Sequence, residues 1–162
     1  MIKLDYLLGC LIICFLISIC LTSCKKDNQD IGGRVELSML DSVNKLRSKG
    51  CRCGTDTMIP VKALTWNNYL SDAAKAHAVD MYNNNYFDHI SPSGTSPIQR
   101  AIAAGYIGQY IGENIGKGYG NIDDVMRAWK NSEDHCKAMM DPLYIEIGAY
   151  SYNGYWVQEF GH

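Results

Sequence analysis

The four histidines of this chain are the side chains best suited to proton or metal chemistry near neutral pH. His77 falls within the apolar stripe of a helical pattern, which favours a hydrogen-bonded position in or beside the core. His162 lies at the end of the sequence and belongs to no motif. His89 and His135 each lie among polar residues, in a loop and at a helix start. Taken alone, such histidines are more typical of surface residues than of ligands.

The seven cysteines fall into two groups. Three of them, Cys51, Cys53 and Cys136, lie in the body of the chain, and four lie in the first 24 residues: Cys10, Cys14, Cys20 and Cys24. Cys51 and Cys53 lack the two-residue spacing of zinc knuckles and thioredoxin-type redox sites. In an oxidising compartment we expect a structural disulfide from Cys136 to either Cys51 or Cys53. Such a bridge contributes about 4 kcal/mol in the chain-entropy model, and it leaves one thiol unpaired.

Several functional classes are excluded by pattern and charge. The 162 residues contain no HExxH, GxSxG or Walker motif, and Gly112 to Gly120 does not follow the dinucleotide-binding pattern. The net charge is -2 and the isoelectric point is about 6.0. Nucleic-acid binding through bulk electrostatics requires a basic face, so we expect no nucleic-acid partner.

The N-terminal segment has the pattern of an export signal. Residues 6–21 are almost wholly apolar and follow Lys3, as in a secretory signal peptide. The tetrapeptide Leu21-Thr22-Ser23-Cys24 resembles a bacterial lipobox, in which cleavage leaves a lipidated cysteine at the new N-terminus. We therefore predict a lipoprotein signal peptide at 1–23, a lipid anchor on Cys24 and a polar tether at 24–33. An uncleaved anchor helix is the alternative, and both place the domain at 34–162 outside the cytoplasm.

The elements that must position these side chains are predicted from periodicity and capping signals. We expect helices at 34–49, 68–83, 97–104 and 122–131, and a short helix that begins after Ser132 and ends at Asp141-Pro142. Residues 51–60 are predicted to form a loop, and 112–120 a short strand with a loop. Alternating residues on both sides of Asn153-Gly154 indicate a C-terminal β-hairpin. The fold class is α+β, with helices packed on a small antiparallel sheet in one domain.

Six short motifs occur in an order that resembles one family. They are Leu64–Asn67, Tyr86–Gly94, Ala104–Tyr106, Gly112–Ile115, Ala128–His135 and Tyr155–Gly161. They resemble the CAP superfamily of cysteine-rich secretory proteins, antigen 5 and pathogenesis-related class 1 proteins. The similarity is greatest to the bacterial sperm-coating-protein-like extracellular domains, and it covers roughly 34–162. It implies a three-layer α-β-α sandwich.

The resemblance also implies a cleft site. Family members commonly carry two histidines and two glutamates there, and in several of them the histidines hold a divalent metal ion. By position, the cleft residues are His89, Glu113 and His135, while Ser132 stands where the second glutamate would be. Two imidazoles with Glu113 suit a divalent metal such as zinc. No cofactor follows with certainty.

Three functions remain open at this point. The first is an exported, membrane-anchored binding module whose cleft holds a metal ion, lipid or peptide. The second is an extracellular hydrolase of protease type, with Glu113 or a metal-bound water as base and Ser132 or water as nucleophile. The third is a structural or adhesive protein of the bacterial cell envelope, to which the many tyrosines would contribute. We favour the first, and we assign no catalytic residue.

Overall fold

The computed structural model describes residues 28–162, with side chains from residue 37 onward. The predicted signal peptide at 1–23, the lipidation site Cys24 and residues 25–27 of the tether lie outside the described residues. Helix α1 spans Asn28–Lys49, so it begins six residues before the predicted start and residues 28–33 of the expected tether are helical. Within residues 28–162, no helix has the length and apolar character needed to cross a membrane.

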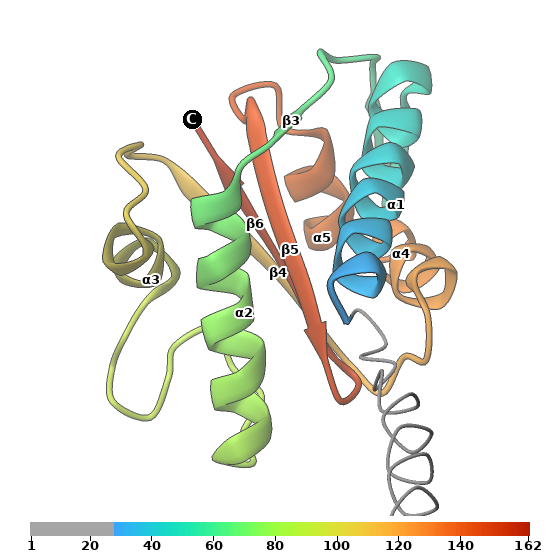
Figure 1. The fold of residues 1–162 in the computed structure, drawn as a ribbon. Helices are drawn as coiled ribbons and strands as arrows, with labels where there is room; N and C mark the ends of the chain where they lie inside the picture. Colours follow the sequence, from blue (N-terminus) through green and yellow to red (C-terminus); the bar gives the residue numbers. More distant parts are fainter. Residues whose placement is uncertain (1–27) are drawn as a thin grey trace, which may run out of the picture.

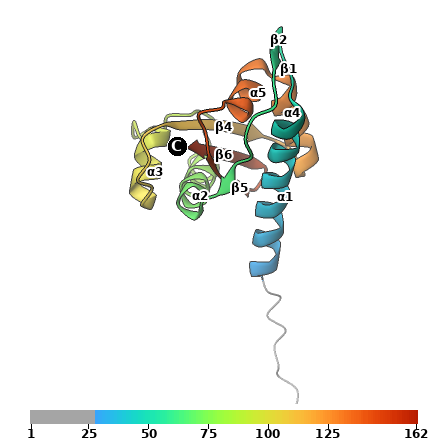
Figure 2. The ribbon, with the colours of Figure 1, turned by 90° about the horizontal axis from the view of Figure 1, so that it is seen from above.

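A four-stranded sheet lies between two layers of helices (Figure 1). The strand order is β3 (Thr65–Trp66), β5 (Glu146–Tyr152), β6 (Tyr155–Gly161) and β4 (Ile111–Lys117), with only the short β3–β5 pair parallel. Helices α2 (Asn68–Asn83) and α3 (Pro97–Ala104) cover one face. Helices α1, α4 (Ile122–Asn131) and α5 (Glu133–Met140) cover the other (Figure 2). The predicted α-β-α sandwich is confirmed.

Local capping signals in the sequence set the helix ends as predicted. Asn67 accepts hydrogen bonds from the backbone N–H groups of the first turn of α2, and Asn121 accepts one in α4. Ser96 begins α3 with a reciprocal capping box to Gln99. Gly105 ends α3 in the left-handed conformation, with a φ of 102°.

The C-terminal hairpin has the predicted turn. Asn153 and Gly154 both have positive φ values, 47° and 81°, and Tyr152 is paired with Tyr155. This turn conformation matches the right-handed twist of the two strands, and Asn-Gly adopts it at low cost. The hairpin places β6 in the middle of the sheet, where all seven of its residues are buried.

The predicted loop at 51–60 is a small hairpin, which corrects the sequence-based expectation. Strands β1 (Cys51–Cys53) and β2 (Asp56–Met58) pair antiparallel. Each strand has three residues, too few to show an alternating pattern in the sequence. Cys53 forms the disulfide with Cys136, and Cys51 has no disulfide partner among the described residues.

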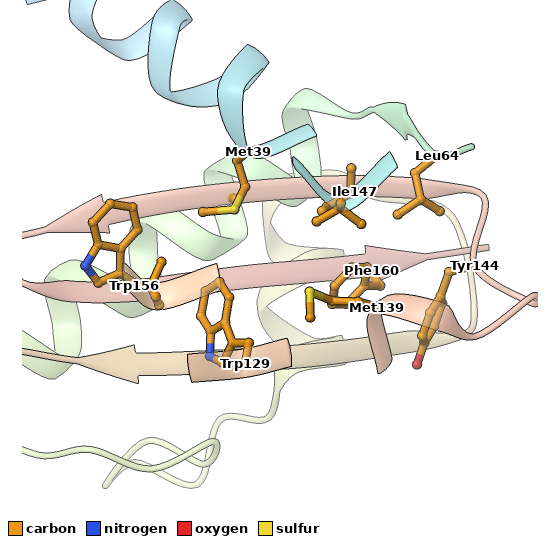
Figure 3. Packing of buried hydrophobic residues seen from close by; sticks show 11 residues of the cluster. Met39, Leu64, Trp129, Met139, Tyr144, Ile147, Trp156 and Phe160 are labelled. Carbon is orange, nitrogen blue, oxygen red and sulfur yellow. The ribbon is translucent and has the colours of Figure 1, made fainter. Parts of the chain in front are cut away.

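The main core lies between the sheet and the layer of α1, α4 and α5. Figure 3 shows large side chains from this layer interleaved with side chains of the strands, among them Met39, Trp129, Ile147, Trp156 and Phe160. On the opposite face α2 packs through small residues. A side chain at Gly148 would overlap the backbone of Ser71, so α2 sits directly against β5. Because both faces are covered, polar residues of β6 lie in the interior.

Candidate functional site

Glu113 is the centre of a buried polar cluster on the α2–α3 side of the sheet. Its side chain is 1% exposed, although it lies on the edge strand β4. The Nδ1 atom of His89 lies 2.7 Å from Oε1, and Nη2 of Arg100 lies 2.6 Å from Oε2. The structure therefore brings together two of the residues that the family motifs predicted, His89 and Glu113.

Arg100 fixes the loop that carries His89. From the inner face of α3, the buried guanidinium also donates to the carbonyl oxygens of His89 and Thr95, both at 3.0 Å. The same side chain thus neutralises Glu113 and holds the backbone of the 89–95 loop. The orientation of the His89 ring is set from two directions, by its own bond to Glu113 and by the position of its main chain.

A second carboxyl group, that of Glu159, lies beside Glu113. The two residues are directly paired across β4 and β6, so their side chains share one face of the sheet. The Glu159 side chain is fully buried, and Nε of Arg100 is 3.9 Å from its Oε1. Burial and the negative charge of Glu113 raise the pKa of Glu159 well above its usual range. We therefore assign the proton to Glu159.

Glu113, by contrast, carries the negative charge of the pair. Burial acts to raise its pKa, but the hydrogen bond from His89 and the charge of Arg100 outweigh burial, so the pKa is lowered. The hydrogen bond to Glu113 raises the pKa of His89 in turn, and burial only partly offsets it. His89 is half exposed, so solvent screens this interaction.

His77 is the buried histidine that its helical position predicted. It is fully buried on α2, and its Nε2 lies 3.0 Å from the carbonyl oxygen of Asp88. The same atom is 3.7 Å from Oε2 of Glu113. Burial lowers the pKa of His77, which favours the neutral ring. His77 therefore supports the cluster from behind and is inaccessible to a ligand.

His135 lies on the other side of the β4 edge, on α5. Its Nδ1 is 2.9 Å from Oγ of Ser132. Ser132 occupies the N-cap position of α5, but its hydroxyl caps no backbone N–H and bonds to His135 instead. Burial and the nearby positive charge of His89 lower the pKa of His135. In a neutral His135 whose proton is on Nδ1, this nitrogen donates to Oγ of Ser132 and the lone pair of Nε2 is free.

The two histidines share one arrangement. Each uses Nδ1 for a bond to a neighbouring side chain, Glu113 for His89 and Ser132 for His135. Within residues 37–162, neither Nε2 atom has a hydrogen-bond partner. Metal-binding histidines show this pattern, because the bond at one ring nitrogen fixes the tautomer and leaves the other as a ligand.

A cavity of about 240 Å³ opens beside His135. Its polar lining includes Ser132 and Lys117, and its apolar walls come mainly from aromatic side chains: Phe87, Tyr119 and Trp129. A larger hollow of about 670 Å³ lies elsewhere, around Pro60 and Leu143, and it contains none of the predicted cleft residues. Of the two, the smaller cavity is therefore the one that adjoins a predicted cleft histidine, His135.

The cleft fits a divalent metal ion only in part. Within the described side chains, the one group of three candidate ligands whose atoms lie within 4.8 Å of one another is Cys51, Cys53 and Cys136. His89, Glu113 and His135 do not form such a group. Glu113 is held by Arg100 and orients His89, so the cleft offers two imidazole nitrogens, with water completing the coordination of any ion.

Sequence reasoning missed Arg100 and Glu159. Glu159 had a usable signal, since it is a carboxylate in the run Tyr155 to Phe160, in which every other residue except Gln158 is apolar. A charged residue in a buried strand requires a partner or a shifted pKa. Arg100 had none, because an arginine on a short amphipathic helix is ordinarily a surface residue.

Comparison with known sequences identifies the family and its bacterial relatives. The model of CAP, the cysteine-rich secretory protein family, matches residues 40–160. YkwD, an uncharacterized protein of Bacillus subtilis, is 39% identical over 102 residues, which are 62% of this chain and 40% of YkwD. YlbC, an uncharacterized membrane protein of the same organism, is 30% identical over 126 residues, 77% of this chain and 34% of YlbC. The chain thus spans well under half the length of both relatives.

Solved structures show the same fold. An extracellular protein from Bacillus anthracis that contains an SCP domain matches with a TM-score of 0.73 and 26% identity, over 83% of this chain and 42% of that one. An outer surface protein of Borrelia burgdorferi matches with a TM-score of 0.66 and 22% identity, over 83% and 92% of the two chains. At 22% identity, the similarity to the Borrelia burgdorferi protein shows a shared fold and nothing more.

Proposed function

The chain belongs to the cysteine-rich secretory protein family, CAP, and from this premise we propose that it is an exported binding module with a divalent-metal cleft. His89 and His135 are the ligands, presented from opposite layers of the sandwich across the edge strand β4. The aromatic cavity beside His135 would receive the apolar part of an organic ligand bound next to the ion.

The arrangement of the two rings carries this proposal. Each Nδ1 is engaged, and each Nε2 is available. The carboxylate of Glu113 behind His89 raises the basicity of that ring and holds its orientation. A bound divalent ion would polarise a ligand oxygen or carboxylate placed in the cavity.

The cluster suits binding better than hydrolysis. Glu113 has a lowered pKa and both of its oxygens are occupied, by His89 and Arg100, so it is a poor general base. Ser132 bonds to Nδ1 of His135, and within residues 37–162 no carboxylate forms a hydrogen bond to that ring, as the third member of a catalytic triad would. The binding module is therefore the better-supported function.

Zinc titration calorimetry of the oxidised protein tests the metal cleft. We expect one zinc ion per chain, and His89→Ala or His135→Ala should weaken binding by about 100-fold or more, since each removes a ligand. Glu113→Gln should weaken it by roughly 10-fold, because it changes only the partner behind His89. His162→Ala, at an exposed histidine outside the cleft, is the matched control. Equal zinc affinity in His89→Ala, His135→Ala and the control would refute the metal cleft.

The anchor is the second element of the proposal. The lipobox-like Leu21-Thr22-Ser23-Cys24 supports lipidation of Cys24, which would hold the module at the outer side of a membrane. Metabolic labelling with a radioactive fatty acid in a bacterial host should label the chain, and Cys24→Ala should abolish the label. Cys20→Ala, in the same apolar segment, should leave it unchanged. Persistent labelling of Cys24→Ala would show that Cys24 is not the anchor.

A further inference from the structure

Three cysteine sulfurs meet where the β1–β2 hairpin packs against α5. Cys51 and Cys53 are two residues apart on β1, so their side chains point to the same side of that strand. Strand β1 lies beside helix α5, which carries Cys136 (Figure 2). Sγ of Cys51 lies 3.7 Å from Sγ of Cys53 and 3.6 Å from Sγ of Cys136, and the latter two sulfurs are bonded.

We propose that Cys51, Cys53 and Cys136 form a three-thiolate site for a soft monovalent metal ion, copper(I), which opens when the Cys53–Cys136 disulfide is reduced. The disulfide alone needs only two cysteines, so it leaves the position of Cys51 unexplained. Thiolates that share one ion at about 2.3 Å lie about 3.8 Å from one another. Cys51 is already at nearly this separation from each of the other two sulfurs.

The surroundings of the three sulfurs favour copper(I) over harder ions. The cluster around Cys53 and Cys136 is completed by apolar side chains and by two thioethers, those of Met58 and Met140. Thiolate donors suit both copper(I) and zinc, but structural zinc sites take four ligands, whereas this cluster offers three sulfurs with two thioethers nearby. The sulfur site therefore favours copper(I), and it differs from the histidine cleft in its donor atoms.

The hairpin and α5 are joined by contacts other than the disulfide. The β1–β2 hairpin is joined to α5 by an ion pair between Lys137 and Asp56, at 2.8 Å. Cys53 and Cys136 are fully buried, while Cys51 is partly exposed and provides the route of entry. The positive charge of Lys130 acts on Cys51 and offsets part of the negative charge that three thiolates would bring.

The reaction balances with an external dithiol as reductant. Two electrons and two protons pass from the dithiol to the disulfide, so the dithiol becomes a disulfide and Cys53 and Cys136 become thiols. Copper(I) then displaces three protons from the three thiols and binds three thiolates. An external disulfide would take two electrons from the Cys53 and Cys136 thiolates and two protons from water to become a dithiol, which re-forms the Cys53–Cys136 bond and releases copper(I).

Copper(I) titration tests the site in the full-length chain in detergent, with alanine at the four cysteines outside the described residues: Cys10, Cys14, Cys20 and Cys24. The protein is reduced with dithiothreitol, desalted under argon and titrated with copper(I) against a chromophoric copper(I) chelator. We expect one tightly bound ion per reduced chain and none in the oxidised chain. Cys51→Ser, which keeps the disulfide, should lower the affinity of the reduced chain by about 100-fold or more.

The controls separate this site from the cleft and from unfolding. Ser48→Cys, which adds an exposed thiol to the Cys51→Ser chain, should not restore tight binding. Zinc binding by the cleft should be the same with and without Cys51. Equal copper(I) affinity in the reduced parent and Cys51→Ser chains would overturn the proposal. So would a reduced chain whose near-ultraviolet circular dichroism is lost and does not return with copper(I).

Discussion

Replacing Arg47 with methionine should destabilise the folded protein by about 5 kcal/mol, most of the stability of a typical domain. The Arg47 side chain is fully buried and donates to four backbone carbonyls: those of Lys62, Met139, Asp141 and Tyr144, at 2.7–3.2 Å. Methionine fills a similar volume but donates nothing. The carbonyls of Met139 and Tyr144 would remain buried without a partner, at about 1–3 kcal/mol each.

This arginine joins parts of the fold that are distant in sequence. It lies on α1, while its acceptors lie before β3, at the C-terminal end of α5 and before β5. The last carbonyls of a helix have no partner within the helix, and Arg47 satisfies one of those in α5. Burial lowers the pKa of Arg47, and the charge of Asp141 opposes this effect.

Urea unfolding with the disulfide intact measures the loss of stability in Arg47→Met. Arg47→Lys should recover only part of it, because an ammonium group lacks the planar fork that reaches several acceptors at once. The matched control is Arg52→Met, since the exposed Arg52 makes one hydrogen bond at 3.5 Å; its effect should be within about 0.5 kcal/mol. A loss below about 1 kcal/mol for Arg47→Met would contradict the assigned role.

Arg100→Met should have the second-largest effect, about 3–5 kcal/mol, because it leaves the buried charge of Glu113 without its cation. Arg100 lies 2.6 Å from Glu113 and holds the 89–95 loop through two carbonyls. The double variant Arg100→Met/Glu113→Gln should recover part of the loss, since no uncompensated charge remains. Arg127→Met, which breaks an exposed ion pair with Asp124, should change stability by less than about 1 kcal/mol.

The carboxyl pair also gives stability a defined pH dependence. The folded-state pKa of Glu159 is raised, so its contribution is fully present below the ordinary glutamate pKa and is lost as pH rises toward the folded value. The pKa of His89 is also raised, so its contribution to stability is likewise lost as the pH rises above the ordinary pKa of histidine. We therefore expect these two groups to lower stability as pH rises from about 4.5 toward 8.

Glu159→Gln isolates the larger part of this effect, because glutamine keeps the shape and cannot ionise. Urea unfolding of metal-free protein from pH 5 to 8 should show a flatter profile in Glu159→Gln than in the parent. Glu133→Gln, at an exposed glutamate on α5, should retain the parental slope. Parallel profiles for the parent and Glu159→Gln would show that Glu159 keeps an ordinary pKa in the folded state.

Local signals predicted most of the elements because their physical causes are local. Asn67, Gly105 and Asn153-Gly154 each act on backbone groups within a few residues, so the ends of α2 and α3 and the C-terminal turn follow from nearby side chains. The three-residue strands β1 and β2 are held by pairing and by α5, and no periodicity marks them. The order of the six motifs identified the family. The prediction that His89 and Glu113 lie close together rests on that family resemblance.

By itself, the sequence determined the family, the sandwich and the residue types of the cleft. Only the tertiary structure decided which carboxyl group holds the proton, since Glu113 and Glu159 meet across two strands 46 positions apart and Arg100 reaches them from α3. It also decided that Cys53 bonds to Cys136 while Cys51 stays beside both sulfurs. Burial, charge and sulfur contact at these places arise from long-range packing, and no spacing along the chain encodes them.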